Sequence, residues 1–408
     1  MRELFSGRHG RIAAGLLVAE FVAATQGLVI AAILPRVVAD LHGLGAYSLA
    51  FGSFFAAFVL FLPFAGPWSD RFGSRRMLVL ALAILALGLG LVAVSPTMPF
   101  FVGARFVEGI GDGIEYAVSF AIVGKAFPEA LRARMLSLTS AAWMIPAILG
   151  PGLGAYVATT FGWRWAFAGF LPLLAVAAAL LVPAVDNTPA RRPTEALAAF
   201  RLLFSRATLR ADEGLHASFV AYALLHAAFF GCDAYVALML TSVRGLSLQL
   251  ASVCVTLAAG GWSIAALFAP ALLARLGKVR VVLVGAASCT LGALGLLAVA
   301  LGAPIALAFG AFTVSGIGIG LTYPTLSAAV FGFAAQRDEG AVSSATLMSG
   351  VIGLLAGVLV CGVSLSLAPH AGESLAIPLA YTFGIAAFFG VALAALSPRL
   401  GLRGRAER

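Results

Sequence analysis

The stretch "GPWSDRFGSRRML", residues 66–78, sets four charged side chains between two long apolar runs. The runs lie at about 46–67 and 77–95, and each approaches the roughly 20 apolar residues that a helix needs to cross a bilayer core. Glycines at 66 and 73 allow the backbone to turn tightly on either side of the charges. The pattern predicts two transmembrane helices joined by a short charged loop.

The remainder of the 408-residue chain repeats this alternation of apolar runs and polar breaks. Hydrophobic residues make up 62% of the chain and charged residues 11%, whereas a soluble protein carries about 25% charged residues. We therefore predict an all-α integral membrane protein with twelve transmembrane helices. The expected spans are residues 11–35, 46–67, 77–95, 98–126, 135–160, 164–184, 214–242, 248–274, 279–301, 304–334, 340–368 and 375–397.

The basic residues are distributed unevenly between the two sides of these spans. With the N-terminus in the cytoplasm, 22 of the 26 Lys and Arg residues fall in cytoplasmic segments. Only Arg36, Arg164 and Arg244 lie on the other side, and Arg105 lies within a span. This positive-inside pattern predicts a multi-pass protein of the cell's inner (plasma) membrane with both termini cytoplasmic.

The longest polar break, residues 185–213, divides the spans six and six. We expect an N-terminal half at 1–184, a cytoplasmic linker at 185–213 and a C-terminal half at 214–408. The middle of the linker, residues 195–209, has the composition of a short amphipathic helix lying on the membrane face.

The two halves share sequence features at matching positions. "GIGDGIEYA" at 109–117 aligns with "GIGIGLTYP" at 316–324, both in the fourth span of their half, and "DRFGSRR" at 70–76 aligns with "ARLGKVR" at 274–280. We therefore predict two related six-helix halves, as in many secondary transporters. The second half has Ile319 and Thr322 where the first has Asp112 and Glu115, so the fold does not require those carboxylates.

The loop at 66–78 resembles the signature loop of the major facilitator superfamily, and the resemblance covers the whole chain. The matching positions are Gly66, Asp70, Arg71, Gly73, Arg75 and Arg76. It implies a major facilitator fold with a cytoplasmic gate. We expect Asp70 to face the positive N-terminal end of the eleventh span near Gly340, and the neighbouring arginines to pair with Glu129. The alternative is a basic loop that only sets the topology.

Span 5 carries "GPGLGA" at 150–155. It resembles the core of a motif found in proton-coupled drug antiporters of this superfamily, at Gly150, Pro151 and Gly154. The longer family pattern has glycines where this chain has Ser137, Pro146 and Ala155. The alternative is a helix kinked by proline and packed through small residues.

Span 4 carries a stripe of charge. "RFVEG" resembles the antiporter pattern Arg-x-x-Gln-Gly with Glu108 in place of Gln, and Arg105, Glu108, Asp112 and Glu115 follow at steps of 3, 4 and 3. At 100° per residue these side chains share a stripe about 80° wide. A central charge facing lipid costs about 2.5–3.5 kcal/mol, so we expect the stripe to face the protein interior. Glu108 then neutralises Arg105, leaving Asp112 and Glu115 for a proton and a substrate's charge. The alternative is a wholly structural charge network.

Span 1 supplies two further polar groups. Glu20 lies about 14 Å from the cytoplasmic end of its span and Glu115 about 18 Å, at 1.5 Å per residue, so we expect the two to meet. Many drug antiporters of this superfamily carry an Asp nine residues before the proline of span 1, where this chain has Gln26 before Pro35. We expect Glu20 to take over that role.

In span 7, His226 and Asp233 are candidates for proton coupling or substrate binding, with simple packing as the alternative for His226. Aromatic side chains expected to border a substrate cavity are Tyr116, Trp143, Tyr222, Tyr235, Trp262 and Tyr323.

We find no nucleotide-binding loop, catalytic triad or metal-ligand spacing, so we expect no enzyme activity, no metal and no cofactor, and a proton gradient as the energy source. The favoured hypothesis is a monomeric proton-coupled transporter that exports lipophilic, cationic or zwitterionic compounds. Its partners are a small-molecule substrate, protons and the lipid bilayer, with no nucleic acid. The alternatives are an exporter or proton-coupled importer of a specific metabolite, sugar or lipid, and a non-transporting sensor or scaffold on the same fold.

Overall fold

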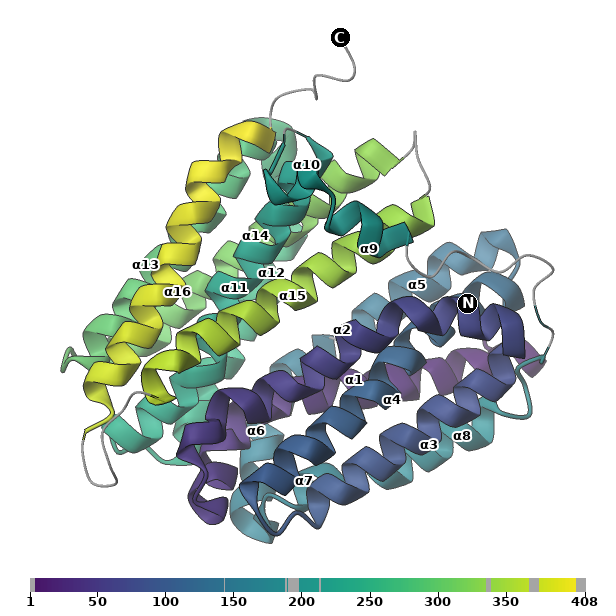
Figure 1. The fold of residues 1–408 in the computed structure, drawn as a ribbon, viewed down its shortest axis with the longest axis horizontal. Helices are drawn as coiled ribbons and strands as arrows, with labels where there is room; N and C mark the ends of the chain where they lie inside the picture. Colours follow the sequence, from purple (N-terminus) through teal and green to yellow (C-terminus); the bar gives the residue numbers. More distant parts are fainter. Residues whose placement is uncertain are drawn as a thin grey trace. The chain divides into compact units, whose positions relative to one another are not determined.

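A computed structural model describes residues 4–142, 144–187, 189, 198–212, 214–334, 339–366 and 374–400. Every regular element in these residues is a helix (Figure 1). The chain separates into two compact units, Met1–Leu197 and Ala198–Arg408. An all-helical chain of this composition satisfies its backbone hydrogen bonds within each helix, which a lipid environment demands.

In the first unit, α4 is the central helix. It packs against α2 on one side and α3 on the other, while α1 packs against α6 and α8. The helices of this unit are α1 (Gly7–Leu41), α2 (Tyr47–Phe72), α3 (Ser74–Ala93), α4 (Met98–Ala126), α5 (Glu129–Ala142), α6 (Met144–Val157), α7 (Trp165–Ala168) and α8 (Phe170–Leu181), with short turns η1 (Leu44–Ala46) and η2 (Ala158–Gly162).

The second unit repeats this arrangement around α14. This helix packs against both α12 and α13, and α11 packs against α15 and α16. The helices are α9 (Ala198–Leu203), α10 (Arg206–Leu209), α11 (Leu215–Leu238), α12 (Leu248–Leu276), α13 (Lys278–Ala300), α14 (Ala306–Ala334), α15 (Glu339–Ser366) and α16 (Ala376–Leu396), with η3 (Met239–Val243) and η4 (Ser397–Leu400).

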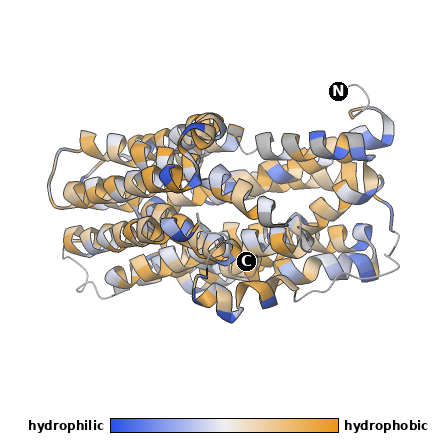
Figure 2. Ribbon diagram, turned by 90° about the horizontal axis from the view of Figure 1, so that it is seen from above, coloured by the Kyte–Doolittle hydropathy of each residue, from blue (hydrophilic) through white to orange (hydrophobic). Residues whose placement is uncertain are grey.

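Nine helices of the described residues are long and apolar enough to cross a membrane, and Figure 2 shows apolar residues along their length. The other three predicted spans correspond to α4, which carries the charged stripe, to α5 and α6 on either side of residue 143, and to the shorter apolar stretch Trp165–Leu181. The chain therefore has the predicted twelve-helix architecture in two six-helix halves.

Two expectations about boundaries need correction. The fifth span is longer than the predicted 135–160, because α5 starts at Glu129 and the stretch ends in a π-helical turn, η2. The single amphipathic helix expected at 195–209 is instead two short helices, α9 and α10, and residues 195–197 lie outside the described part of the chain. Ser205 starts the second helix, since its hydroxyl accepts a hydrogen bond from the Thr208 backbone N–H.

The repeated "GIG" sequences explain the central position of α4 and α14. A Cβ atom at Gly109 would collide with the α2 backbone at Phe54, and one at Gly111 would collide with α3 at Leu85. The matching Gly316 in α14 lies equally close to the α12 backbone at Ala258. Small residues at these positions let helix backbones approach closely. The part of the sequence shared by the two halves is thus the packing surface, and the carboxylates are additions to one half.

Candidate functional site

The charged side chains of α4 are buried within the first unit. Arg105 and Glu108 are 0% exposed, Glu115 is 1% exposed and Asp112 is 5% exposed. The 3-4-3 spacing therefore predicted correctly that the stripe turns inward. Burial of four ionisable groups on one helix requires partners or protons for each of them.

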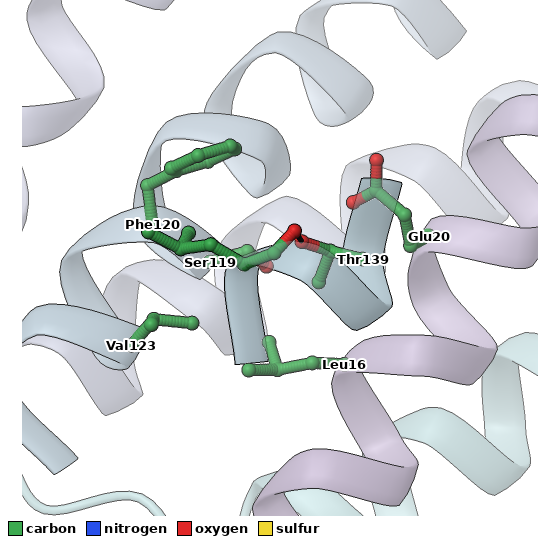
Figure 3. Close-up of a pocket in the computed structure, with 7 residues that line it drawn as sticks. Leu16, Glu20, Ser119, Phe120, Val123 and Thr139 are labelled. Carbon is green, nitrogen blue, oxygen red and sulfur yellow. Dashed lines mark hydrogen bonds between the residues drawn. The ribbon is translucent and has the colours of Figure 1, made fainter. Parts of the chain in front are cut away.

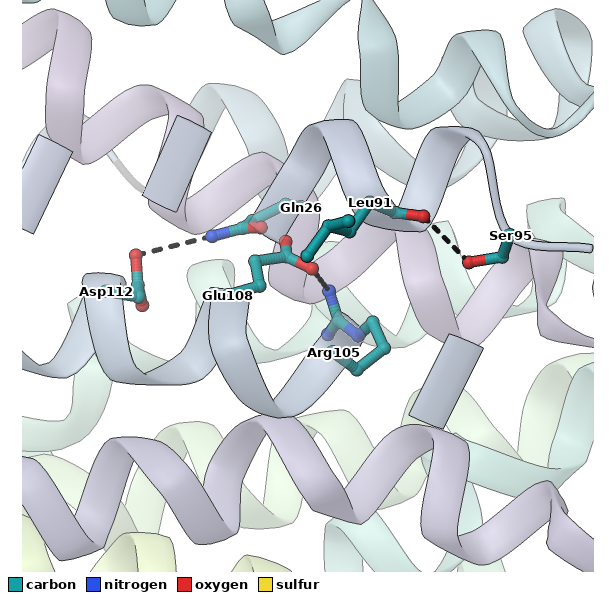
Figure 4. A network of polar contacts seen from close by, with 6 residues as sticks. All are labelled: Gln26, Leu91, Ser95, Arg105, Glu108 and Asp112. Atoms are coloured by element: carbon teal, nitrogen blue, oxygen red, sulfur yellow. Dashed lines mark hydrogen bonds and ion pairs between the residues drawn. The ribbon is translucent and has the colours of Figure 1, made fainter. Parts of the chain in front are cut away.

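Arg105 and Glu108 form the predicted ion pair, with 2.6 Å between Nη1 of Arg105 and Oε2 of Glu108 (Figure 4). The guanidinium also lies over the ring of Phe54, 4.5 Å from its centroid, and 5.8 Å from that of Phe167. Both rings attract the cation through their π-faces. The guanidinium is thus held by one carboxylate and two aromatic rings, while its Nε and Nη2 have no hydrogen-bond partner among the described residues.

Asp112 receives a hydrogen bond from a different helix. Nε2 of Gln26, in α1, donates to Oδ1 of Asp112 across 3.3 Å (Figure 4). Gln26 is fully buried, and Asp112 has no ion pair within the described residues. The sequence showed Gln26 only as a departure from the family pattern and gave no sign of this contact.

Glu115 and Glu20 both have Ser119 of α4 as a neighbour, and a direct contact between the two carboxyls stays a prediction. Oγ of Ser119 donates to Oε1 of Glu115 across 2.6 Å. Ser119 also lines a small pocket between α1, α4 and α5, together with Glu20 and Thr139 (Figure 3). Glu20 is 5% exposed, so its carboxyl is almost completely enclosed by protein. Ser119 therefore bonds to Glu115 and borders the pocket that Glu20 also lines.

The charges of this site do not balance. Among the described buried side chains of the first unit, Glu20, Glu108, Asp112 and Glu115 are acids, and Arg105 is the one cation. If every group of α4 were ionised, the three negative charges of Glu108, Asp112 and Glu115 would face the one positive charge of Arg105. Uncompensated charge is costly in a membrane interior, so the site needs protons or a bound cation.

The charged loop joins α2 to α3 through Gly73, whose φ of 94° is a conformation that favours glycine. Asp70 pairs with Lys125 of α4, at 3.0 Å from Nζ to Oδ1, and Lys125 also donates to Ser74 across 3.3 Å. Lys125 was missed by the sequence analysis, because nothing in its own helix indicates a partner in another. The contact expected between Asp70 and the eleventh span would join the two units, and it stays a prediction.

The expected pairing of the loop arginines with Glu129 is wrong for the described residues. Arg71, Arg75, Arg76 and Glu129 are all exposed, and no ion pair joins them. The backbone N–H of Arg76 instead donates to Oδ1 of Asn187. Exposed ion pairs gain little over hydration, which explains why these side chains stay apart.

The "GPGLGA" glycines pack α6 against α1. A Cβ at Gly154 would lie 2.6 Å from Cγ1 of Val29, and one at Gly150 would lie 3.7 Å from Thr25. Pro151 lies inside α6, and Pro146 lies near its start. This geometry matches the packing interpretation of the motif, and a role in antiport stays a prediction.

The predicted aromatic side chains separate into distinct environments. Tyr116 packs against Phe58 and Phe120 in the first unit. Tyr235 does not border a cavity, because it is 0% exposed and its hydroxyl donates to the Val358 carbonyl at 2.6 Å. Trp143 lies outside the described residues.

In the second unit, Tyr222, Trp262 and Tyr323 lie together around His226, whose ring stacks between those of Tyr222 and Phe230. Phe230 was not predicted, although its spacing of four residues from His226 could have indicated it. Asp233 is 5% exposed and makes no hydrogen bond or ion pair with any described residue.

A sequence model described as the Major Facilitator Superfamily matches residues 16–358 of the chain. Among curated proteins, the chain is 28% identical over 153 residues to "Multidrug resistance protein 3" of Bacillus subtilis (strain 168), covering 38% of this chain and 30% of that protein. It is 26% identical over 167 residues to "Multidrug efflux pump SdrM" of Staphylococcus aureus (strain N315), covering 41% of this chain and 37% of that pump. The matches thus span about a third of these relatives.

Two solved structures share the fold over nearly the whole chain. The nucleoside transporter NupG superposes with a TM-score of 0.72 at 17% identity, covering 95% of this chain and 99% of that one. A D-xylose-proton symporter superposes with a TM-score of 0.74 at 15% identity, covering 96% and 97%. At such identities the likeness establishes the fold alone.

Proposed function

The chain belongs to the Major Facilitator Superfamily and is a multi-pass membrane transporter, and on that premise we propose that it exports lipophilic cationic or zwitterionic compounds in exchange for protons. We place it in the inner (plasma) membrane with both termini in the cytoplasm, acting as a monomer without a cofactor. The proton gradient supplies the energy.

The observation that carries this proposal is the imbalance, among the described buried side chains of α4, of three carboxyls (Glu108, Asp112 and Glu115) against the one guanidinium of Arg105. Arg105 is paired with Glu108, so Asp112 and Glu115 remain to hold either protons or a cation. A site that binds either protons or the cation, but not both at once, couples proton entry to cation export.

The mechanism is competition for these carboxyls during alternating access. A cationic substrate from the cytoplasm binds where Asp112 and Glu115 are ionised. Protons from outside then neutralise the carboxyls and release the cation outward. The hydrogen bonds from Gln26 and Ser119 hold the two carboxyls in place while they change charge. One charge crossing 100 mV is worth about 2.3 kcal/mol, which is ample for export against a gradient.

The test is transport by the full chain in proteoliposomes with an acidic interior and ethidium added outside. We expect ethidium to accumulate and the trapped pH indicator to report loss of internal protons when ethidium is added. Protein-free liposomes and an Asp112→Asn/Glu115→Gln variant are the controls.

Ethidium uptake without proton movement, or no response to any lipophilic cation, would overturn the antiport proposal. Proton movement on addition of a neutral sugar, nucleoside or lipid instead of a cation would favour a transporter of a specific metabolite. No transport of any compound tested would favour the sensor or scaffold alternative.

A further inference from the structure

Five aromatic rings of the second unit form one continuous array, which we name the aromatic wall: Tyr222, His226, Phe230, Trp262 and Tyr323. The first three are four residues apart on α11, so they lie above one another on one side of the helix. Their rings are nearly parallel, with centroids 5.2 and 5.9 Å apart and interplanar angles of 17° and 20°.

Two rings from other helices meet this stack edge-on. Trp262 of α12 lies 6.3 Å from Phe230 at 71°, and Tyr323 of α14 lies 5.9 Å from His226 at 61°. Trp262 and Tyr323 also contact each other, with centroids 6.1 Å apart. Aromatic rings attract further rings and cations in both stacked and edge-on arrangements.

The outer part of the wall differs from ordinary aromatic packing in this unit. Phe229, on the neighbouring side of α11, is 3% exposed and stacks on Phe312 at 13°, as a core residue does. By contrast, Phe230 and Trp262 are only half-buried, and Tyr323 is 38% exposed. These three rings therefore keep surface that a ligand can cover.

His226 carries one ring nitrogen that faces Gly350 of α15 and another that is bonded within its own helix. Its Nδ1 lies 2.7 Å from the Tyr222 carbonyl oxygen, and because a carbonyl only accepts, Nδ1 carries the hydrogen. In the neutral ring Nε2 is then an acceptor. The side chain is 8% exposed, and Nε2 has no hydrogen bond within the described part of the chain. A Cβ at Gly350 would lie 3.1 Å from Nε2, so the glycine leaves room for the ring.

Asp233 lies on the same stripe of α11, seven residues beyond His226 and about 10.5 Å farther along the axis. It is 5% exposed and has no hydrogen-bonding or ionic partner among the described residues. A buried carboxyl without a partner is expensive at membrane depth, and a bound cation relieves that cost. The stripe thus offers π-faces, one acceptor and one acidic group in sequence along a single helix.

We propose that the aromatic wall and Asp233 form a binding site for planar aromatic cations that carry an N–H donor. The ligand's ring system stacks on Phe230 and Trp262, its N–H group donates to Nε2 of His226, and Asp233 faces its positive charge. This inference rests on the proposed export of lipophilic cations. It adds the class of substrate, and it assigns recognition of the rings to residues other than the carboxyls of α4.

The test is equilibrium binding to the purified full-length protein in detergent, with no pH gradient. The probes are ethidium, which is planar and has amino N–H groups, and tetraphenylphosphonium, which is neither planar nor an N–H donor. Trp262 is the chain's one tryptophan after residue 197. Ethidium bound at the wall should quench the fluorescence of Trp262. The part of the tryptophan quenching that is lost in Trp262→Phe therefore reports contact with the wall.

The decisive variant is His226→Phe, which keeps a ring and removes Nε2. We expect its Kd for ethidium to rise about three- to tenfold, as for loss of one hydrogen bond, and its Kd for tetraphenylphosphonium to stay within twofold. Phe230→Ala and Trp262→Ala each remove a π-face, and we expect a three- to tenfold rise for ethidium. Phe388→Ala, an exposed aromatic of α16, is the matched control and leaves both Kd values unchanged.

Equal weakening of both probes by His226→Phe, or ethidium binding within twofold of wild type in the Phe230 and Trp262 variants, would overturn the proposal. Thermal unfolding in the same detergent identifies any variant that fails to fold, and His226→Phe then decides alone. Ethidium binding at the wall without proton movement in proteoliposomes removes the antiport proposal and keeps this one. If proton-coupled ethidium transport is unchanged in the Phe230 and Trp262 variants, the antiport proposal stands and the aromatic-wall proposal is wrong.

Discussion

Gln26 of α1 donates a hydrogen bond to the carboxyl of Asp112 in α4, and this bond joins two helices that are far apart in sequence. Oε1 of the same amide has no hydrogen-bond partner in the described residues, so its orientation is set by the bond to Asp112. The amide of Gln26 lies nine residues before Pro35, at the position where the resemblance to drug antiporters implies an Asp.

Removing the amide should weaken the contact between α1 and α4. For Gln26→Leu we expect a loss of about 1 kcal/mol of unfolding free energy, because a buried carboxyl loses its donor. Denaturant unfolding in detergent measures this loss. Thr25→Val is the matched control, since among the described residues the Thr25 hydroxyl bonds to the Phe21 carbonyl of its own helix and to no other helix. An effect of Gln26→Leu no larger than that of the control would contradict the role of the bond.

Competition between protons and a cation predicts the sign of the pH dependence. Protonation removes the negative charge of Asp112 and Glu115, so we expect ethidium affinity to fall as the pH falls and to recover as it rises. Asp112→Asn/Glu115→Gln should bind ethidium at least tenfold more weakly at high pH and lose most of the pH dependence. Titration of ethidium binding between pH 5 and pH 9, about the range in which tuned buried groups titrate, measures both effects.

The control for this titration is Asp212→Asn, which changes an exposed carboxyl outside the site. We expect it to follow the wild-type pH profile. If the double variant also keeps that profile, the two carboxyls do not hold the proton.

Sequence spacing predicted what lies within one helix and failed for most contacts between helices. The 3-4-3 steps placed Arg105 beside Glu108, because helical periodicity fixes neighbours on the same helix. Depth along the membrane predicted that Glu20 lies at the level of Glu115, and Glu20 lines the same pocket as Ser119, the hydrogen-bond donor to Glu115. The bonds from Gln26 to Asp112 and from Lys125 to Asp70 depend instead on the rotation and register of two packed helices. A single sequence does not contain those quantities.

The same limit explains the aromatic side chains. Position in a span showed that Tyr235 is in the membrane, but not that its hydroxyl reaches the Val358 carbonyl in α15. Tyr222 and Phe230 lie four residues on either side of His226, so helical periodicity places the three rings on one side of α11. The contacts of this stack with Trp262 of α12 and Tyr323 of α14 depend on how the helices pack, which the sequence does not show.

The buried pair of Arg105 and Glu108 should be costly to break from one side. Arg105→Met leaves the Glu108 carboxyl uncompensated, and we expect a loss of about 3–5 kcal/mol of unfolding free energy. Arg105→Met/Glu108→Met removes both charges and should recover most of that loss. Denaturant unfolding of the two variants measures the difference. A double variant no more stable than the single one would show that the aromatic contacts of Arg105, not the ion pair, dominate.

The pair of Asp70 and Lys125 should behave differently because it is partly exposed. The side chain of Lys125 is 40% exposed and that of Asp70 is 14% exposed. We expect a coupling energy of about 0.2–1 kcal/mol from a double-mutant cycle with Asp70→Ala and Lys125→Ala. The coupling should shrink in about 1 M salt, where exposed charges are screened. A coupling above 2 kcal/mol that resists salt would mean that the pair is desolvated.

The glycines shared by the two halves should be needed for packing in each half alike. Gly111 approaches α3 at Leu85, and Gly318 approaches α13 at Gly285, so neither position has room for a methyl group. We expect Gly111→Ala and Gly318→Ala each to lower the unfolding free energy by about 1–3 kcal/mol, as overpacking does. Gly124→Ala, also in α4 but with open space at its Cβ, should be neutral or stabilising by up to about 1 kcal/mol through helix propensity. If all three variants are equally stable, close helix packing does not explain why the two halves share these glycines.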